Sequence, residues 1–257
     1  MKKKWLIVPD INRLDESLEI SRKYNASFEY DDFSESEVYQ SKDEIERRVR
    51  IYKSLDRDRS LDTLHGVFKD IAFISDDDVI RNRSRELMEQ SMNIAVSLQI
   101  RGVVFHTGLI SNLLSQKKYA DYSVTAMAEY FSYLADKYPQ ISIYIENSFE
   151  PNPTSLLALM DRLAGKKNVR ICLDYAHASI SGVNTDMWVK ALSSYIGHVH
   201  INDNDLAADL HLEAGKGKID FKRMFEQFEA NSVDVPMLIE ISDIDAAEKS
   251  LEYLNLI

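Results

Sequence analysis

Short runs of apolar and aromatic residues alternate with longer stretches of helical periodicity along the whole 257-residue chain. A short apolar run bounded by turn residues indicates a buried strand, whereas apolar residues that recur every three or four positions indicate an amphipathic helix. By this criterion we predict eight strands, with helical segments in the gaps between them: Trp5–Val8, Ser27–Tyr30, Leu61–His65, Val103–His106, Ser142–Glu146, Val169–Asp174, His198–Ile201 and Met237–Ile241.

Polar residues mark the predicted starts of two helices. Ser75 stands before three aspartates and a helical pattern over Val79–Leu98, so it is a candidate N-cap with acidic residues in the first turn. Asp220 stands directly before the pattern over Phe221–Phe228. Both residues would supply a side-chain acceptor to backbone amides that lack a partner in the first helical turn.

Strict alternation of strands and helices implies a parallel sheet with right-handed crossovers. Eight such units in about 250 residues are typical of a closed (β/α)8 TIM barrel. An open doubly wound sheet is the alternative, but the first junction, Val8–Asn12, has no glycine-rich phosphate turn. No linker divides the chain, because its 8 glycines and 5 prolines are scattered. We therefore predict one barrel domain over residues 1–257.

Histidines and carboxylates gather where the predicted strands end. Since catalytic side chains of this fold come from the carboxyl ends of many strands, we expect these residues to converge on one mouth of the barrel. A lone histidine or carboxylate at a strand end is usually structural, but nine together indicate a shared ligand. The nine are His65, His106, Glu146, Asp174, His177, His200, Asp209, His211 and Glu240, and of the six histidines only His198 stays outside this set.

The donor types in this set indicate a divalent cation. Neutral imidazoles and carboxylates without thiolate suit Zn²⁺, Mn²⁺, Co²⁺ or Mg²⁺. Phe28–Tyr30 and Trp5 either line the same mouth and stack on a ligand or pack in the core. Gly215–Gly217 either offers backbone amides to a phosphate or forms a tight turn.

Charge and cysteine content narrow the partners and the setting. The formal net charge of −11 repels polyanions, so we expect no nucleic-acid partner. The single Cys172 lies in an apolar run and suits a buried thiol in a reducing, cytoplasmic setting. The apolar run after Met1–Lys4 ends at Pro9, too early for a signal peptide, and no segment has the roughly 20 apolar residues of a membrane span. The sequence leaves open whether the protein is a homo-oligomer.

Essentially the whole chain resembles the xylose-isomerase-like barrel superfamily. That superfamily includes sugar-phosphate isomerases and epimerases, ketose 3-epimerases, inosose-type dehydratases and the endonuclease IV repair enzymes. The most specific matches are Ile145–Asn147, Leu173–His177, His198–Asp203, Asp209–His211 and Gly215–Asp220.

In the sugar-active members a Glu, an Asp, a His and a second Glu bind one divalent ion. By motif these ligands fall on Glu146, Asp174, His200 and Glu240. The resemblance implies that a ketose chelates the ion, that the ion stabilises an enediolate, and that Glu146 and Glu240 remove and return the proton. It also implies that His177 holds a substrate hydroxyl, and with a single ion His65 and His106 would contact substrate as well.

In the endonuclease IV members a trinuclear zinc cluster uses further ligands, and each of these also has a match. The three sites would be His65, His106 and Glu146; Glu146, Asp174, His200 and Glu240; and His177, Asp209 and His211. The loop Asn202–Ala208, however, carries only negative charge. Ketose 3-epimerases have an arginine six residues after the metal histidine, where this chain has Leu206.

The resemblance leads to a metal-dependent isomerase or epimerase of a small sugar, sugar phosphate or polyol. A dehydratase of the inosose type begins with the same enolisation and is a close alternative. A zinc phosphodiesterase of the endonuclease IV kind belongs to a second class. A non-catalytic sugar-binding barrel belongs to a third class, which the pair Glu146 and Glu240 disfavours.

Overall fold

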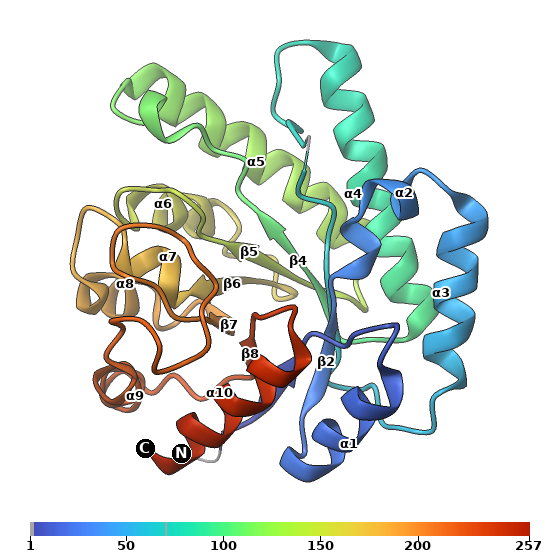
Figure 1. The fold of residues 1–257 in the computed structure, drawn as a ribbon. Helices are drawn as coiled ribbons and strands as arrows, with labels where there is room; N and C mark the ends of the chain where they lie inside the picture. The colour runs from blue at the N-terminus through green and yellow to red at the C-terminus, as the bar shows by residue number, and fades with distance from the viewer. Residues whose placement is uncertain (1–2, 70) are drawn as a thin grey trace.

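The computed structural model describes residues 3–69 and 71–257, and its strands close into a barrel (Figure 1). The strands pair in sequence order and all neighbours are parallel, with β8 pairing back to β1. This confirms the predicted (β/α)8 fold. The strands are β1 (Trp5–Ile7), β2 (Ser27–Tyr30), β3 (Thr63–His65), β4 (Gly102–His106), β5 (Ser142–Glu146), β6 (Val169–Asp174), β7 (Ile196–Ile201) and β8 (Met237–Ile239).

Helices surround the barrel, and the last helix lies beside the first (Figure 1). None of the helices in the described part of the chain combines the length and the apolar content of a membrane span. The α-helices are α1 (Leu14–Tyr24), α2 (Ser36–Tyr39), α3 (Lys42–Ser54), α4 (Asp78–Leu98), α5 (Lys117–Lys137), α6 (Thr154–Arg162), α7 (Tyr175–Ser179), α8 (Thr185–Leu192), α9 (Phe221–Ala230) and α10 (Ile244–Leu256), and the short 3₁₀ turns are η1 (Asp32–Ser34) and η2 (Ser111–Leu113).

One predicted helix cap is wrong and the other is confirmed. Asp77, not Ser75, caps α4, because its carboxylate stands directly before the first helical residue and accepts hydrogen bonds from the amides of Val79 and Ile80. A carboxylate at that position also benefits from the helix dipole. Ser75 instead accepts a hydrogen bond from the Asp77 amide. Asp220 caps α9 as predicted.

Strand β2 shows how alternate residues divide between the helical layer and the barrel interior. The Tyr30 ring lies 4.5 Å from the ring of Tyr52 in α3, and the Arg57 guanidinium lies over the Phe28 ring. Glu29, between them, points into the barrel, since successive strand side chains face opposite sides. Of the two roles left open for these aromatic rings, core packing is therefore the observed one, and Trp5 likewise packs edge-on against Phe225 of α9.

The loop after β7 is folded around the carboxylate of Asp203. Asp203 is fully buried and accepts hydrogen bonds from the amides of Gly215, Gly217 and Ile219 at 2.8–3.0 Å. A Cβ added at Gly217 would lie 2.2 Å from a backbone oxygen, so only glycine fits. Gly215–Gly217 is therefore a tight turn in which the amides of Gly215 and Gly217 already donate to Asp203. The turn fixes the loop that carries Asp209 and His211.

We expect Asp203→Asn to lower the free energy of unfolding by about 2 kcal/mol, measured by urea denaturation. Whichever oxygen is replaced, the NH₂ group would face two backbone N–H donors, partly buried at Oδ2 and buried at Oδ1, and leave them without an acceptor. Asp205→Asn is the control, because Asp205 accepts from two amides in a more exposed turn of the same loop. Equal losses in the two variants would contradict a special role for Asp203.

Candidate metal centre and active site

All nine histidines and carboxylates singled out from the sequence lie at the carboxyl ends of the strands or in the loops that follow. His65, His106, Glu146 and Asp174 end four consecutive strands, β3 to β6. His200 is next to last in β7, Glu240 directly follows β8, and His177 lies in α7. Asp209 and His211 lie in the loop held by Asp203.

Glu146 is at the centre of this group. One of its oxygens, Oε2, lies 3.3 Å from both His65 Nε2 and His106 Nε2. The other oxygen, Oε1, lies 3.4 Å from His200 Nδ1, and His200 Nδ1 is also 3.4 Å from Glu240 Oε1. Asp174 joins through His177, whose Nδ1 is 3.7 Å from Asp174 Oδ2 and 3.6 Å from Glu146 Oε1.

The donor atoms of this centre fit a divalent cation. Both carboxylate oxygens of Glu146, Asp174 Oδ2 and His200 Nδ1 are buried and make no hydrogen bond within the described part of the chain. Buried polar atoms are normally satisfied, and buried charges are paired or coordinate a metal. One donor atom each from His65, Glu146, His200 and Glu240 lies within 4.8 Å of the others, and so do those of Glu146, Asp174 and His177.

A second group of donors surrounds Asp209. His177 Nδ1 lies 2.8 Å from the carbonyl oxygen of Asn147, and His211 Nδ1 lies 3.0 Å from that of Glu240. Because a carbonyl only accepts, both Nδ1 atoms carry a hydrogen, and both Nε2 atoms face Asp209 Oδ2 at 3.1 Å. Each Nε2 therefore holds either a proton or a shared cation, so this group can also bind a metal.

The protonated form of that second group is strongly favoured by its surroundings. Burial alone would lower the pKa of His177, but the charges of Asp174 and Asp209 outweigh it and raise the pKa to about 11. The hydrogen bond to Asp209 raises the pKa of His211 to about 10. A cation bound there would have to replace these two protons.

Two acidic residues of the site were not among the nine candidates: Asp31 was not considered, and Glu29 was considered only as part of Phe28–Tyr30, a stretch that could line the mouth. Asp31 follows β2 and lines the mouth, and burial raises the pKa of this carboxyl to about 7. The strand-end rule that found the other residues would also have found Asp31. Glu29 lies deeper, inside the barrel, 3.0 Å from both His198 Nε2 and His200 Nε2. An acidic residue between two aromatic strand residues was the available signal for Glu29.

The mouth contains a cavity of about 520 Å³. Its walls combine the polar groups above with the aromatic rings of Phe68 and Phe149. The Phe68 ring lies 5.0 Å from the ring of His65, and the Phe149 ring lies 5.8 Å from that of His177. Apolar walls above a polar floor are typical of small-molecule sites.

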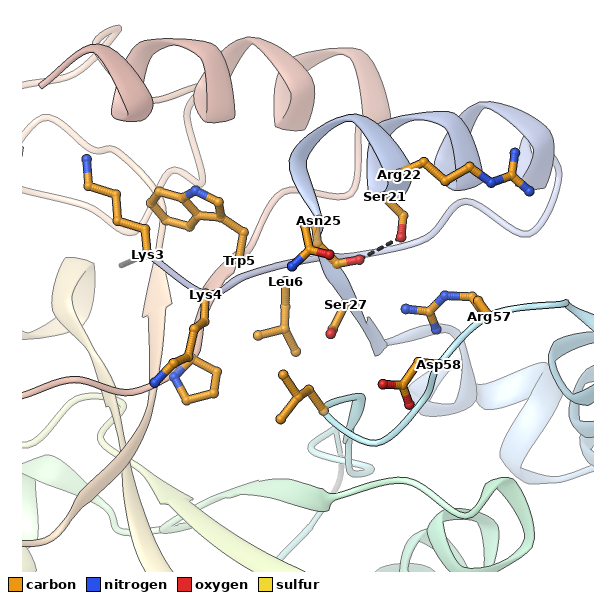
Figure 2. A pocket seen from close by; sticks show the side chains of 13 residues that line it. Lys3, Lys4, Trp5, Leu6, Ser21, Arg22, Asn25, Ser27, Arg57 and Asp58 are labelled. Carbon is orange, nitrogen blue, oxygen red and sulfur yellow. Dashed lines mark hydrogen bonds between the residues drawn. The ribbon is translucent and has the colours of Figure 1, made fainter. Parts of the chain in front are cut away.

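A second cavity of about 400 Å³ lies at the amino ends of β1 and β2, opposite the mouth (Figure 2). Four cationic residues line it, but Figure 2 shows that Lys3, Lys4 and Arg22 extend in different directions. The fourth, Arg57, is paired with the buried Asp62. Because these groups do not converge, this cavity lacks the donor set that the mouth has.

A family model described as "Xylose isomerase-like TIM barrel" matches residues 26–257, and the chain belongs to this family. The uncharacterized protein MJ1311 of Methanocaldococcus jannaschii is 30% identical over 204 residues, which cover 75% of this chain and 68% of that protein. The family expected from the sequence is thereby confirmed.

Solved structures show the same fold. The structure of a D-tagatose 3-epimerase-like protein has 26% sequence identity and a TM-score of 0.77, covering 98% of this chain and 96% of that one. The TTHB071 protein from Thermus thermophilus, soaked with ZnCl₂, has 21% identity and a TM-score of 0.73, covering 100% of this chain and 97% of that one. At 21% identity the second comparison is used for the fold alone.

We expect Zn²⁺ or Mn²⁺ to raise the melting temperature by several degrees, because an ion that binds only the folded state stabilises it by about 2.7 kcal/mol at a hundredfold excess over Kd. Glu146→Gln should abolish most of this rise, since Glu146 contacts four of the imidazoles. Glu150→Gln is the control: Glu150 is also buried but accepts hydrogen bonds from Thr107 and Ser148. A full metal-dependent rise in Glu146→Gln would contradict the assignment.

Proposed function

We propose that this protein is a divalent-metal-dependent isomerase or epimerase that acts on a small sugar, sugar phosphate or polyol through an enediolate. The observation that carries the proposal is the pair of carboxylates, Glu146 and Glu240, that face His200 Nδ1 at the same distance of 3.4 Å in the barrel mouth. Membership of the xylose isomerase-like family and the 26% identity to a D-tagatose 3-epimerase-like protein support the substrate class.

Four residues would hold the ion: Glu146, Asp174, His200 and Glu240. When bound, a divalent cation supplies positive charge that stabilises negative charge on substrate oxygens during deprotonation of the neighbouring carbon. The mixed imidazole and carboxylate set suits Zn²⁺, Mn²⁺, Co²⁺ or Mg²⁺.

Glu240 is the better candidate for the base that takes the carbon-bound proton. Without an ion, burial opposes ionisation of Glu240, but the charge of His200 outweighs burial and keeps the pKa of Glu240 below its ordinary value. A bound cation would supply the positive charge in place of His200 and would likewise favour the carboxylate. Oε2 of Glu240 accepts a hydrogen bond from Asn202 Nδ2 at 3.4 Å, which fixes its orientation. Both oxygens of Glu146 already face imidazoles, so Glu146 is less free to act as the first base. In this proposal it exchanges the proton on the opposite face of the substrate carbon.

The remaining mouth residues would bind and shield the substrate. His65, His106 and His177 offer ring nitrogens to sugar hydroxyls where they do not bind metal. Phe68 and Phe149 offer apolar faces to sugar carbons and restrict the access of water to the reacting carbon. Leu206, in the loop after β7, cannot act as the arginine of ketose 3-epimerases does, so the proposal does not extend to that particular reaction.

We expect Glu240→Gln to reduce exchange of the substrate's carbon-bound proton with solvent deuterium by about 10²–10⁴-fold, because an amide cannot act as a base. The exchange is followed by proton NMR in D₂O over a panel of ketoses, aldoses and sugar phosphates, with metal content measured in each sample. Glu213→Gln is the control, since Glu213 pairs loosely with Lys216 at 3.9 Å outside the mouth. Undiminished exchange in a fully metallated Glu240→Gln sample would remove Glu240 from this role.

Two alternatives share parts of this site. A dehydratase would use the same first proton abstraction and is distinguished by loss of water from the product. A zinc phosphodiesterase of the endonuclease IV kind is favoured by one observation: eight of the nine donors form three groups, two of which share Glu146, and the ninth, His106, lies 3.3 Å from Glu146. Against it, the net charge is −11 and Asn202–Ala208 has no lysine or arginine to contact phosphates.

We expect the zinc-loaded protein to leave a duplex with one abasic site intact while it converts at least one small polyol. Duplex binding needs several phosphate contacts from lysine or arginine, and the acidic mouth does not supply them. Elemental analysis of the same sample counts the zinc ions per chain. Incision of the duplex by a protein with three zinc ions, together with inertness toward every sugar, would support the phosphodiesterase instead.

The setting of this activity is proposed from the same features of the chain. Its single buried thiol, Cys172, favours a reducing, cytoplasmic environment. The proposed partner is the small-molecule substrate, with neither nucleic acid nor membrane involved.

A further inference from the structure

Glu29 lies in the barrel interior, one layer below the mouth. It is fully buried, and its Oε1 is 3.0 Å from His200 Nε2. Its Oε2 accepts a hydrogen bond from the Thr63 hydroxyl and lies 3.0 Å from His198 Nε2. His198 and His200 are two residues apart on β7, so both point inward toward this carboxylate.

The contacts of Glu29 hold it in one orientation. Thr63 is its register partner on the adjacent β3, and His198 approaches from β7. A carboxylate without access to water is stable only where such donors meet it. The remaining oxygen, Oε1, faces His200 Nε2 at 3.0 Å, and neither atom has a hydrogen-bond partner among the described residues.

His200 differs from His65, His177 and His211 in the contacts of its ring nitrogens. In His65, His177 and His211, Nδ1 contacts a backbone carbonyl, of Gly66, Asn147 and Glu240 respectively. Behind His200 stands the carboxylate of Glu29. A carboxylate behind a metal-bound imidazole fixes its tautomer and makes it a stronger ligand, and loss of such a partner typically weakens metal binding by about 10–100-fold.

We propose that Glu29 is a positioning residue for the metal centre: with an ion bound, its Oε1 accepts a hydrogen bond from Nε2–H of His200, which leaves the Nδ1 lone pair free to face Glu146, Glu240 and the ion. Thr63 and His198 act by holding Glu29. This inference rests on the proposed metal centre, but it does not depend on which substrate the protein converts.

The first test compares the zinc affinity of the purified 257-residue chain with that of its Glu29→Gln variant, by competition with a chromophoric chelator at fixed pH. We expect about 10–100-fold weaker binding in the variant. Asp62→Asn is the matched control, because Asp62 is also a fully buried carboxylate, next to Thr63 in sequence, but it binds Phe28, Tyr30 and Arg57. Equal zinc affinity in wild type and Glu29→Gln, or an equal loss in Asp62→Asn, would overturn the proposal.

Two measurements keep the proposal testable should Glu29→Gln fail to fold. In the zinc-loaded wild type, imidazole ¹⁵N NMR should find the hydrogen of His200 on Nε2 and the metal on Nδ1, and the reverse arrangement would overturn the proposal. Thr63→Val removes one donor to Glu29 and should weaken zinc binding in the same direction, by a smaller factor. A wild type that binds no divalent ion would refute the proposed function, whereas normal binding in both variants would refute only the role of Glu29.

Discussion

A carboxylate buried away from water must be paired with positively charged or hydrogen-bond-donating groups. At the mouth of the barrel this requirement applies above all to Glu146, which is fully buried. Its partners are His65, His106 and His200, which come from β3, β4 and β7. These strands are not all neighbours, so the charge balance at one buried group depends on the closure of the whole sheet. Barrel and site therefore form together, because a strand end that moved would leave a buried charge unpaired.

The same constraint continues below the mouth, where the barrel interior is partly polar. On β2, the aromatic side chains of Phe28 and Tyr30 face the helices, whereas Glu29 faces the barrel interior. Its neighbours in the interior, Thr63 and His198, complete its hydrogen bonds. A barrel filled only with aliphatic side chains would gain hydrophobic stabilisation, but it would offer no support to the ligands above.

Much of the fold and most of the site follow from local sequence rules. Apolar runs alternating with helical patterns are sufficient for the barrel, and strand-end polarity finds His65, Glu146 and Asp174, because parallel strands in a closed sheet must end on the same face. Cap choice was less predictable: Ser75 and Asp77 are both good acceptors, and only the point at which the backbone turns helical decides between them.

The sequence does not predict which side chains meet across the barrel interior. Glu29 and His198 are 169 residues apart in the chain, and no periodicity relates them. Such contacts depend on strand tilt and on side-chain reach inside the closed sheet, which the local pattern of apolar and polar residues does not encode.

The carboxylate of Asp203 serves as a built-in anion for the loop after β7, because it accepts hydrogen bonds from the loop's own amides. Many loops with several convergent amides become ordered only when a phosphate or another anion binds, and the ligand then has to offset the entropy of ordering. Here the covalently attached carboxylate takes that place permanently. The loop therefore needs no anion from a ligand to satisfy these amides, so a ligand in the mouth would not have to offset the entropy of ordering them.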